Sequence, residues 1–280
     1  MYNRVTLLGN AQDAGRPQFA CTKPCCEDAR LNSELSRMPV SLGLHGDSFG
    51  LIEATRCIDN QLTMVNNPKI SDLWITHAHL GHIEGLGQFG KESSNQKNIQ
   101  LHCSDSVYTY LQSHPTWNKL FLRGNLSVAN FSSNNVKPIK VPHRSEDFET
   151  HAFLIKGSHE KLLFLPDHDT WEATLSKVEC RSPRDWFNSL DVNIVLLDGT
   201  FWSDNELGNR SQGNVPHPSV KQTLELMGKR REEDPRIIFI HLNHTNPLHY
   251  KSSEEYQKVE QMGWEAVSYT HLTLPTTPYV

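Results

Sequence analysis

Long hydrophobic runs are absent from this chain of 280 residues. None approaches the ~20 consecutive apolar residues that a helix needs to span a bilayer, so the sequence predicts no membrane protein. The N-terminal residues lack the extended apolar segment of a secretory signal peptide, and we expect a cytoplasmic location. An excess of positive charge is also absent. The formal net charge is −5, which gives no support to a nucleic-acid-binding surface.

Apolar residues are nevertheless numerous enough to form a core. Hydrophobic residues make up 37% of the sequence and charged residues 21%, values typical of a soluble globular protein. Length alone does not decide between one large domain and two small ones. The function therefore has to be sought in local motifs.

The most informative segment is a histidine-rich stretch from Leu73 to Leu86. It begins with a short β-prone run and then presents His77, His79 and His82. His77 and His79 share a face because side chains alternate along a strand, and His82 returns from the start of the following helix. Imidazoles suit zinc and iron, and three of them leave open positions for water. A surface turn that happens to be rich in histidine is the alternative.

Further histidine and aspartate residues occur at the ends of segments that are expected to be strands. His143, Asp167 and His241 each follow such a segment. Histidines scattered through a core would not all lie at strand ends, whereas ligands that meet at one rim of a sheet would. Asp198 also ends a buried strand, and Asp169 is a second carboxylate near Asp167 that suits a helix cap better. The pattern predicts a metal centre.

The loop after the first expected strand, residues 9–20, contains Gly and Pro at several positions. Loops attached to rigid strands often line functional sites, so Gln12 and Asp13 are candidate site residues. An aspartate that only forms a turn is the alternative for Asp13.

The six cysteines are unevenly distributed along the chain. Cys21, Cys25 and Cys26 form a cluster. In a reducing compartment such a cluster indicates a metal site or reactive thiols rather than a disulfide. The remaining cysteines are interpreted as small buried apolar residues; they are Cys57, Cys103 and Cys180.

These motifs resemble the metallo-β-lactamase superfamily, whose signature is His-x-His-x-Asp-His. More narrowly, the chain is similar to the branch that contains the coenzyme PQQ synthesis protein B and the phosphoribosyl cyclic phosphodiesterase. The segments that carry the resemblance are Ala-Gln-Asp-Ala-Gly-Arg-Pro-Gln, Thr-His-Ala-His-Leu-Gly-His-Ile-Glu-Gly-Leu, Val-Pro-His-Arg, Leu-Pro-Asp-His-Asp-Thr-Trp, Leu-Leu-Asp-Gly-Thr-Phe and His-Leu-Asn-His-Thr-Asn-Pro. The resemblance implies an α/β fold, a four-layer αβ/βα sandwich formed by a single domain over residues 1–267. It also implies a dinuclear metal site between the two sheets.

The ligands of this site follow from the resemblance. Those implied for the first metal are His77, His79 and His143. Those implied for the second are His82 and His241, with Asp167 bridging the two metals and His244 as the alternative to His241. The catalytic residues of this assignment are Asp167, His82 and His241.

One residue departs from the superfamily signature: Gly81 stands where the pattern has Asp. Because glycine has no side chain to bind with, the second metal position is expected to be weak, empty or differently filled. Glu84 and Asp169 are nearby carboxylates that are candidates to compensate. On this reasoning, Gly81→Asp should raise the affinity for the second metal.

The branch also carries a structural zinc held by N-terminal cysteines and a distant histidine. Cys21, Cys26 and His217 match these ligands in position, and Cys25 takes the place of the middle cysteine because Lys23 stands there. Three cysteines and one histidine form a closed tetrahedral site of the structural kind.

The expected function is that of a zinc-dependent hydrolase acting on a small phosphodiester or ester-like substrate. The alternatives are an oxygenase similar to the PQQ-synthesis enzymes, or a metal-binding or carrier protein with weak activity. One structural zinc and one or two active-site zinc ions are expected, with iron or manganese as alternatives in the active site. The expected partner is a small-molecule substrate, not nucleic acid or membrane. Formation of a homodimer is left as an open alternative.

The C-terminal segment, residues 268–280, does not continue the pattern of the superfamily. Its amino-acid sequence resembles translated sequencing-adapter sequence, and the segment is expected to be a non-native or disordered tail. It is therefore excluded from the fold prediction.

Overall fold

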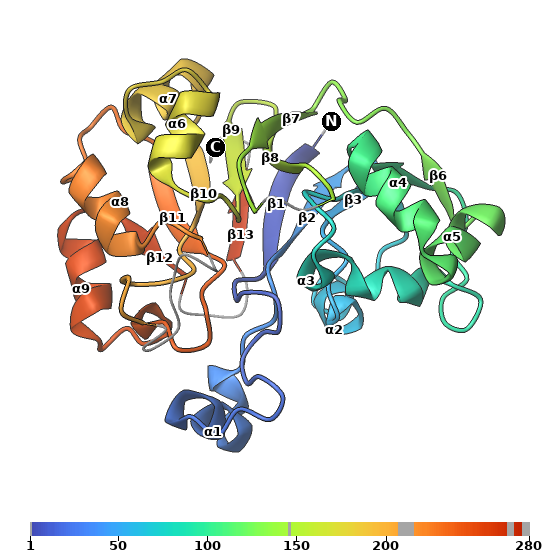
Figure 1. The fold of residues 1–280 in the computed structure, drawn as a ribbon, viewed down its shortest axis with the longest axis horizontal. Coiled ribbons are helices and arrows are strands. Elements are labelled where there is room, and N and C mark those ends of the chain that lie inside the picture. Colours follow the sequence, from blue (N-terminus) through green and yellow to red (C-terminus); the bar gives the residue numbers. More distant parts are fainter. Residues whose placement is uncertain (1, 145–146, 207–215, 268–271, 276–280) are drawn as a thin grey trace.

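Two β-sheets lie face to face in the centre of the molecule, with helices on the outer face of each (Figure 1). The structure is a computed structural model that describes residues 2–144, 147–206, 216–267 and 272–275. Within these residues, one sheet has the strand order β13-β1-β2-β3-β4-β5-β6 and the other has β12-β11-β10-β9-β8-β7. This arrangement is the four-layer sandwich that the resemblance to the superfamily implies.

The first sheet is formed by β1 (Tyr2–Gly9), β2 (Ser41–Gly46), β3 (Phe49–Ile52), β4 (Ile70–Trp74), β5 (Ile99–His102), β6 (Leu126–Val128) and β13 (Leu272–Pro275). The second is formed by β7 (Val136–Val141), β8 (Thr150–Lys156), β9 (Lys161–Leu165), β10 (Ile194–Asp198), β11 (Arg236–Ile240) and β12 (Glu265–Ala266). Neighbouring strands β3, β4, β5 and β6 run parallel, as do β9, β10, β11 and β12. The carboxyl ends within each parallel set therefore lie at one edge of its sheet.

The α-helices are α1 (Pro24–Leu31), α2 (Ile58–Thr63), α3 (Leu80–Ile83), α4 (Asp105–Ser113), α5 (Pro115–Leu122), α6 (Trp171–Lys177), α7 (Pro183–Leu190), α8 (Val220–Met227) and α9 (Glu254–Gln261). Short 3₁₀ segments are η1 (Ser33–Leu35), η2 (Glu84–Phe89) and η4 (Pro247–His249). Several helices begin at a hydroxyl residue whose oxygen accepts a backbone N–H of the first turn; these caps are Ser104, Thr170, Ser182, Ser219 and Ser253. Among the described residues, no helix has the length and apolar character needed to cross a membrane.

Continuous apolar strands in the second sheet are explained by burial on both faces. In β9, Leu162 and Phe164 belong to the inner core between the sheets. Leu163 and Leu165 point the other way, into the core beneath the helices. Because side chains alternate along a strand, a strand buried on both faces needs apolar residues at every position.

The helices of the outer layers bury apolar side chains against the outer face of each sheet. The second sheet is covered by α6, α7, α8 and α9, through residues such as Trp171, Phe187, Leu224 and Tyr256. The first sheet is covered by α2, α3, α4 and α5, through residues such as Ile58, Ile83, Val107 and Leu120. Helix α1 lies apart from both layers, at the bottom of Figure 1.

Four residues of the C-terminal segment form a strand that the sequence did not predict. Leu272–Pro275 pairs antiparallel with β1, with Leu272 opposite Leu7 and Leu274 opposite Val5. The physical reason is that β1 would otherwise leave its outer backbone groups unpaired at the sheet edge. The remaining tail residues, 268–271 and 276–280, lie outside the described residues. The single domain over residues 1–267 stays a prediction.

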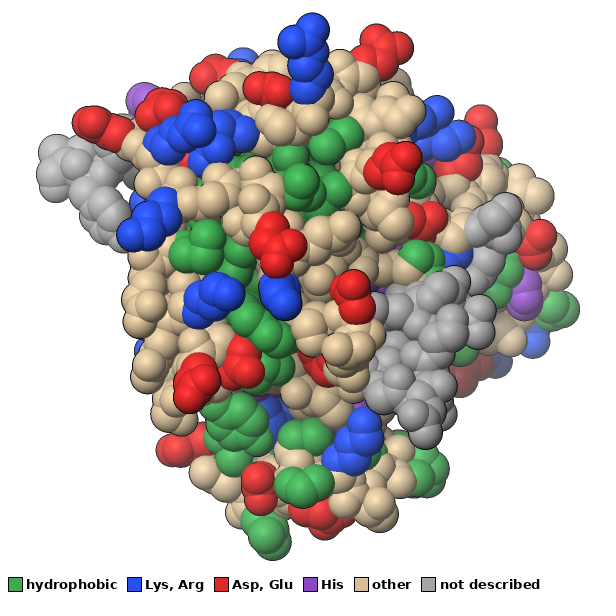
Figure 2. All heavy atoms as spheres, turned by 60° about the vertical axis from the view of Figure 1, so that its left-hand side comes forward, with side chains coloured by type: hydrophobic (Ala, Val, Ile, Leu, Met, Phe, Trp, Pro, Cys, Tyr) green, Lys and Arg blue, Asp and Glu red, His purple; other side chains and the backbone are tan. Residues whose placement is uncertain are grey.

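Acidic and basic side chains are interspersed on the face of the molecule drawn in Figure 2. No broad stripe of one sign stands out on this face. A mixed surface of this kind suits a protein with a small net charge.

Candidate metal centre

Histidine and aspartate side chains from both sheets meet at one rim of the sandwich. His77 and His79 follow β4, His143 follows β7, Asp167 follows β9 and His241 follows β11. Groups of these side chains place one ligand atom each within 4.8 Å of one another. The structure thus brings together the strand-end residues that the sequence selects.

The first group consists of His77, His79 and His143. The distance between His77 Nε2 and His79 Nδ1 is 2.7 Å, and the His143 ring lies 5.3 Å and 5.2 Å from the His77 and His79 rings. His77 is completely buried. Burial and the neighbouring histidines lower the pKa of His77 well below its usual value, so its ring is neutral at pH 7. A neutral imidazole is the form that binds metals.

Hydrogen bonds behind His77 determine which of its nitrogens carries the proton. The Thr76 hydroxyl donates to Glu53 Oε1 at 2.6 Å. Its only proton is therefore engaged, so its contact of 2.9 Å with His77 Nδ1 requires His77 to donate. His77 Nε2 is left unprotonated, and its lone pair faces His79 Nδ1 at 2.7 Å. Buried partners of this kind orient metal-binding histidines in many proteins.

A second group surrounds Asp167. Asp167 Oδ2 lies 3.4 Å from His82 Nε2, and Asp167 Oδ1 lies 3.6 Å from His241 Nε2 and 3.8 Å from His143 Nε2. Asp167 thus stands between the histidines of both groups. Burial favours the neutral acid, but His241, His82 and His143 outweigh burial and lower the pKa of Asp167, which is therefore a carboxylate.

His241 is held in the same way as His77. The Thr200 hydroxyl donates to Asp198 Oδ1 at 2.7 Å, so its contact of 2.9 Å with His241 Nδ1 requires His241 to donate. His241 Nε2 then points its lone pair toward Asp167. The other oxygen, Asp198 Oδ2, lies 2.7 Å from His217 Nδ1. One buried carboxylate therefore orients two histidines of the centre.

Several buried polar atoms of the centre have no hydrogen-bond partner among the described residues. They include Asp167 Oδ2, His82 Nε2 and His241 Nε2. An unsatisfied buried polar atom costs ~1–3 kcal/mol, so such a concentration needs an explanation. A bound cation would satisfy all three atoms, and the residues present fit a divalent metal.

Two residues of the centre have left-handed backbone conformations. The φ angle is +68° at Glu53, which follows β3, and +58° at His241. Such values are uncommon for residues other than glycine and concentrate at functional sites. Glu53 is completely buried, its Oε1 lies 3.3 Å from His82 Nδ1, and burial raises the pKa of its carboxyl group. Burial disfavours the charged form of His82, but Glu53 and Asp167 outweigh burial and raise the His82 pKa.

The two carboxylates expected to compensate for Gly81 are engaged elsewhere. Glu84 forms an exposed ion pair with Arg56 at 2.7 Å. Asp169 Oδ1 lies 3.4 Å from His143 Nδ1, on the outer side of the first group. The prediction that either one replaces the missing aspartate is wrong. A group of possible ligands instead combines Asp13 with His82 and His241.

The cysteine site also needs a correction. The ring atom His244 Nδ1 lies 3.9 Å from Cys21 Sγ, 3.4 Å from Cys25 Sγ and 3.3 Å from Cys26 Sγ. We call these four residues the cysteine clip. The sequence assigned His217 to this site and His244 to the histidine centre as an alternative, and both assignments are wrong.

The physical reason lies in the path of the chain. The first loop pairs with the segment after β11, since Ala11 forms a bridge with Leu242. This pairing brings the loop that carries the cysteines next to His244. His217 precedes α8 and reaches the histidine centre instead, with its ring 5.1 Å from that of His143.

Sequence reasoning missed the residues that support the histidines. Asp198 was recognised only as a strand end, and Glu53, Thr76 and Thr200 were given no role. The available signal was their position, because each lies at or beside the carboxyl end of a strand at the same rim. Position alone, however, does not reveal a hydrogen bond between residues far apart in the chain.

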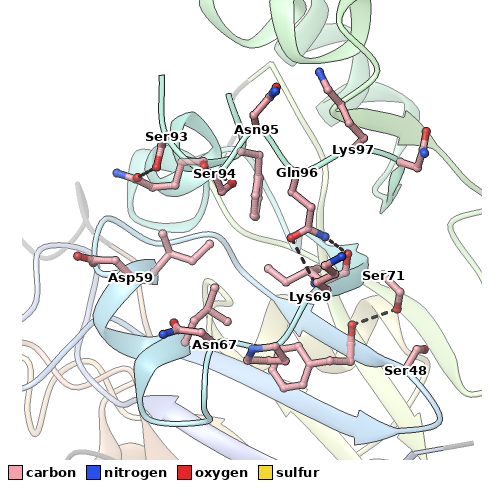
Figure 3. A pocket seen from close by; sticks show the side chains of 18 residues that line it. Ser48, Asp59, Asn67, Lys69, Ser71, Ser93, Ser94, Asn95, Gln96 and Lys97 are labelled. Atoms are coloured by element: carbon pink, nitrogen blue, oxygen red, sulfur yellow. Dashed lines mark hydrogen bonds between the residues drawn. The ribbon is translucent and has the colours of Figure 1, made fainter. Parts of the chain in front are cut away.

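A separate cavity of about 990 Å³ lies at the opposite end of β4, around Ile70 (Figure 3). Its lining includes apolar residues such as Phe49. Polar side chains from Ser93 to Lys97 form one wall. None of its lining residues belongs to the histidine centre. The length of β4 separates the two sites.

Comparison with known proteins agrees with this geometry. The profile of the β-lactamase superfamily domain matches residues 50–242. The chain belongs to the β-lactamase superfamily. The expected superfamily and its sandwich fold are thereby confirmed.

Within this superfamily the chain is similar to PQQ synthesis proteins. Coenzyme PQQ synthesis protein B of Bradyrhizobium diazoefficiens is 24% identical over 297 residues, which cover 94% of this chain and 96% of the relative. The structure of Zn²⁺-bound PqqB from Methylobacterium extorquens superposes with a TM-score of 0.76 at 18% identity, covering 97% of this chain and 99% of the other. The structure of a diphosphatase from the PhnP family superposes with a TM-score of 0.68 at 17% identity, covering 98% of each chain. At these identities, the solved structures support the fold.

Proposed function

We propose that this chain is a metal-dependent hydrolase that cleaves a small phosphodiester or ester-like bond with a metal-activated water. One observation carries the proposal. The ring nitrogens of two histidine groups converge on the buried carboxylate of Asp167, and hydrogen bonds through Thr76 and Thr200 keep the inward Nε2 atoms of His77 and His241 unprotonated. This arrangement favours a cation with open positions over a structural site.

The ligands proposed for the first metal are His77, His79 and His143, and those for the second include His82 and His241, with Asp167 between them. When bound, a divalent cation supplies Lewis acidity and brings the pKa of a coordinated water toward ~7. Asp167 holds a negative charge at the centre, where it can accept a hydrogen bond from that water. Zinc fits the nitrogen-rich ligand set.

His217 is proposed to protonate the leaving group. A ring nitrogen of His217 lies within 4.8 Å of ligand atoms of His143 and Asp167. Asp198 Oδ2 accepts from His217 Nδ1 at 2.7 Å and fixes the orientation of the ring. The carboxylate also stabilises the imidazolium form, as in other paired general acids. His217 would give its proton to the oxygen that departs from the substrate.

The cysteine clip is proposed as a structural zinc site. It combines three thiols with one imidazole, the ligand set of closed tetrahedral zinc sites. Cys25 and Cys26 lie in the first turn of α1, and His244 lies 218 positions after Cys26. Zinc at the clip would tie α1 to the segment that follows β11.

A metal-dependent oxygenase is the second candidate. It is favoured by the similarity to proteins named Coenzyme PQQ synthesis protein B, which extends over 94% of this chain. Histidine-rich sites with open positions also suit iron. Iron in place of zinc at the histidine centre, with oxygen-dependent turnover, would support this candidate.

The test is metal analysis of the purified protein followed by a panel of phosphodiester and lactone substrates. We expect metal in excess of the clip, and hydrolysis that stops on chelation and returns with zinc. A His77→Ala and His79→Ala double variant should lose the metal of the first group while the clip retains its zinc. The matched control is Glu84→Gln, whose carboxylate is exposed and pairs with Arg56. Unchanged metal content in the double variant would refute the assignment.

A further inference from the structure

The space next to Gly81 is filled by Asp13. A Cβ atom added to Gly81 would lie 2.2 Å from Asp13 Oδ1, 2.7 Å from Asp13 Cα and 2.8 Å from Asp13 Cβ. All three of the nearest atoms therefore belong to one residue. These distances are far below van der Waals contact, so a side chain at position 81 and the observed position of Asp13 exclude each other.

The carboxylate of Asp13 also faces the histidines of the second group. Its Oδ1 lies 3.5 Å from His82 Nε2 and 4.0 Å from His241 Nε2. The matching separations from Asp167 are 3.4 Å and 3.6 Å. In a tetrahedral zinc site with bonds of ~2.1 Å, ligand atoms stand about 3.4 Å apart. The four measured separations between carboxylate and imidazole atoms are thus close to the spacing that a single cation requires.

Backbone contacts hold Asp13 in this position. Gln12 N donates to Leu242 O at 2.9 Å, and Leu242 N donates to Asn10 O at 2.8 Å. Gly15 N closes a turn by donating to Gln12 O at 2.7 Å, which places Asp13 at the second position of that turn. The loop is therefore fixed to the residue that directly follows His241. A ligand delivered this way is positioned before the metal arrives.

We propose that Asp13 is the anionic ligand of the second metal position, in place of the side chain that Gly81 lacks. The proposal rests on the proposed function in one respect, since it takes the histidine centre to bind metal. It reverses the expectation that Gly81 leaves the second metal position weak or empty, because the carboxylate of Asp13 adds to the ligands His82, His241 and Asp167. With this ligand the second position would hold its metal firmly rather than weakly. The loop that contains Asp13 becomes part of the centre.

The experiment compares zinc affinity at the second position in the full-length protein. Asp13→Asn keeps the shape of the side chain but removes its charge, and it should weaken the second zinc by more than about tenfold while the first zinc is retained. Gly81→Asp alone should not raise the affinity, since its Cβ would overlap Asp13. Combining Asp13→Gly with Gly81→Asp should restore the second zinc. Zinc content and competition with a chelating dye measure each step, independently of turnover.

Glu84→Gln is the control, because Glu84 is a carboxylate close to Gly81 in sequence that pairs with Arg56 instead. It should leave both zinc affinities unchanged. If Asp13→Asn retains the second zinc with the affinity of the unaltered protein, Asp13 is not a ligand, and the proposed function is unaffected. If the unaltered protein takes up no zinc beyond the clip, both the proposed function and this inference fail. If Asp13→Asn loses the second zinc and the double variant Asp13→Gly with Gly81→Asp does not regain it, the claim that Asp13 takes the place of a side chain at position 81 is also overturned.

Discussion

Replacing Thr76 with valine should disable the first metal group without touching a ligand. Valine has nearly the shape of threonine but no hydroxyl group. The substitution removes the link between Glu53 Oε1, at 2.6 Å, and His77 Nδ1, at 2.9 Å. His77 is then free to carry its proton on Nε2, where the proton would block metal binding.

The magnitude follows from two effects of the substitution. First, Glu53 and His77 are both completely buried, so each loses a partner that water cannot replace. An unsatisfied buried polar group costs ~1–3 kcal/mol, and we expect a loss of about 2 kcal/mol in the free energy of unfolding of the metal-free protein. Second, loss of a residue that orients a metal ligand commonly weakens metal binding by about 10–100-fold. We expect the affinity for the first metal to fall by a factor in that range.

The assay combines zinc titration with nitrogen NMR of the histidine rings in metal-free protein. Thr76→Ser is the matched control, because serine retains the hydroxyl group that accepts from His77 and donates to Glu53. We expect Thr76→Ser to bind zinc nearly as well as the unaltered protein, and Thr76→Val to show a changed proton position on His77. Unaltered zinc affinity in Thr76→Val, together with an unaltered His77 tautomer, would refute the reasoning.

Three further predictions concern parts of the chain away from the histidine centre. His244→Ala should release the clip zinc and lower the melting temperature, whereas His217→Ala should leave that zinc in place; equal zinc loss in both variants would contradict the assignment of His244. Asp234→Ala should lower the free energy of unfolding by about 3 kcal/mol in denaturant titrations, because Asp234 is buried and accepts from Arg184 at 2.6 Å and 2.9 Å. Burial opposes ionisation of Asp234, but Arg184 outweighs burial and lowers its pKa, so this stabilisation should be present above pH ~4 and lost as the pH falls through the lowered value. A chain that ends at Val267 should fold and retain the metal of the histidine centre, with only a small fall in melting temperature. The reason is that Val267 belongs to the inner core, whereas β13 pairs only with the edge of β1. Failure of this shorter chain to fold would show that β13 is essential.

Apolar runs in the sequence made individual strands predictable, whereas the arrangement of the two sheets was implied by the resemblance to the superfamily. β9 and β10 read as continuous apolar runs because each is buried on both faces. The chemically active residues stand directly after such runs, at the ends of β4, β9 and β11. His77, His79, His143, Asp167 and His241 could therefore be selected by their positions at strand ends. This step needs no knowledge of distant contacts, because the backbone geometry of a strand depends on neighbouring residues only.

Contacts between distant segments were decided only by the tertiary structure. His217 and His244 are both histidines in the last third of the chain, and nothing local distinguishes which one faces the cysteines. Similarly, Gly81 indicated a missing ligand, but the carboxylate that fills its place comes from Asp13, in the loop after β1. The path of the first loop along the segment after β11 settles both cases, since it carries the cysteines to His244 and Asp13 to His241. That path depends on how the two sheets pack, which no short stretch of sequence specifies.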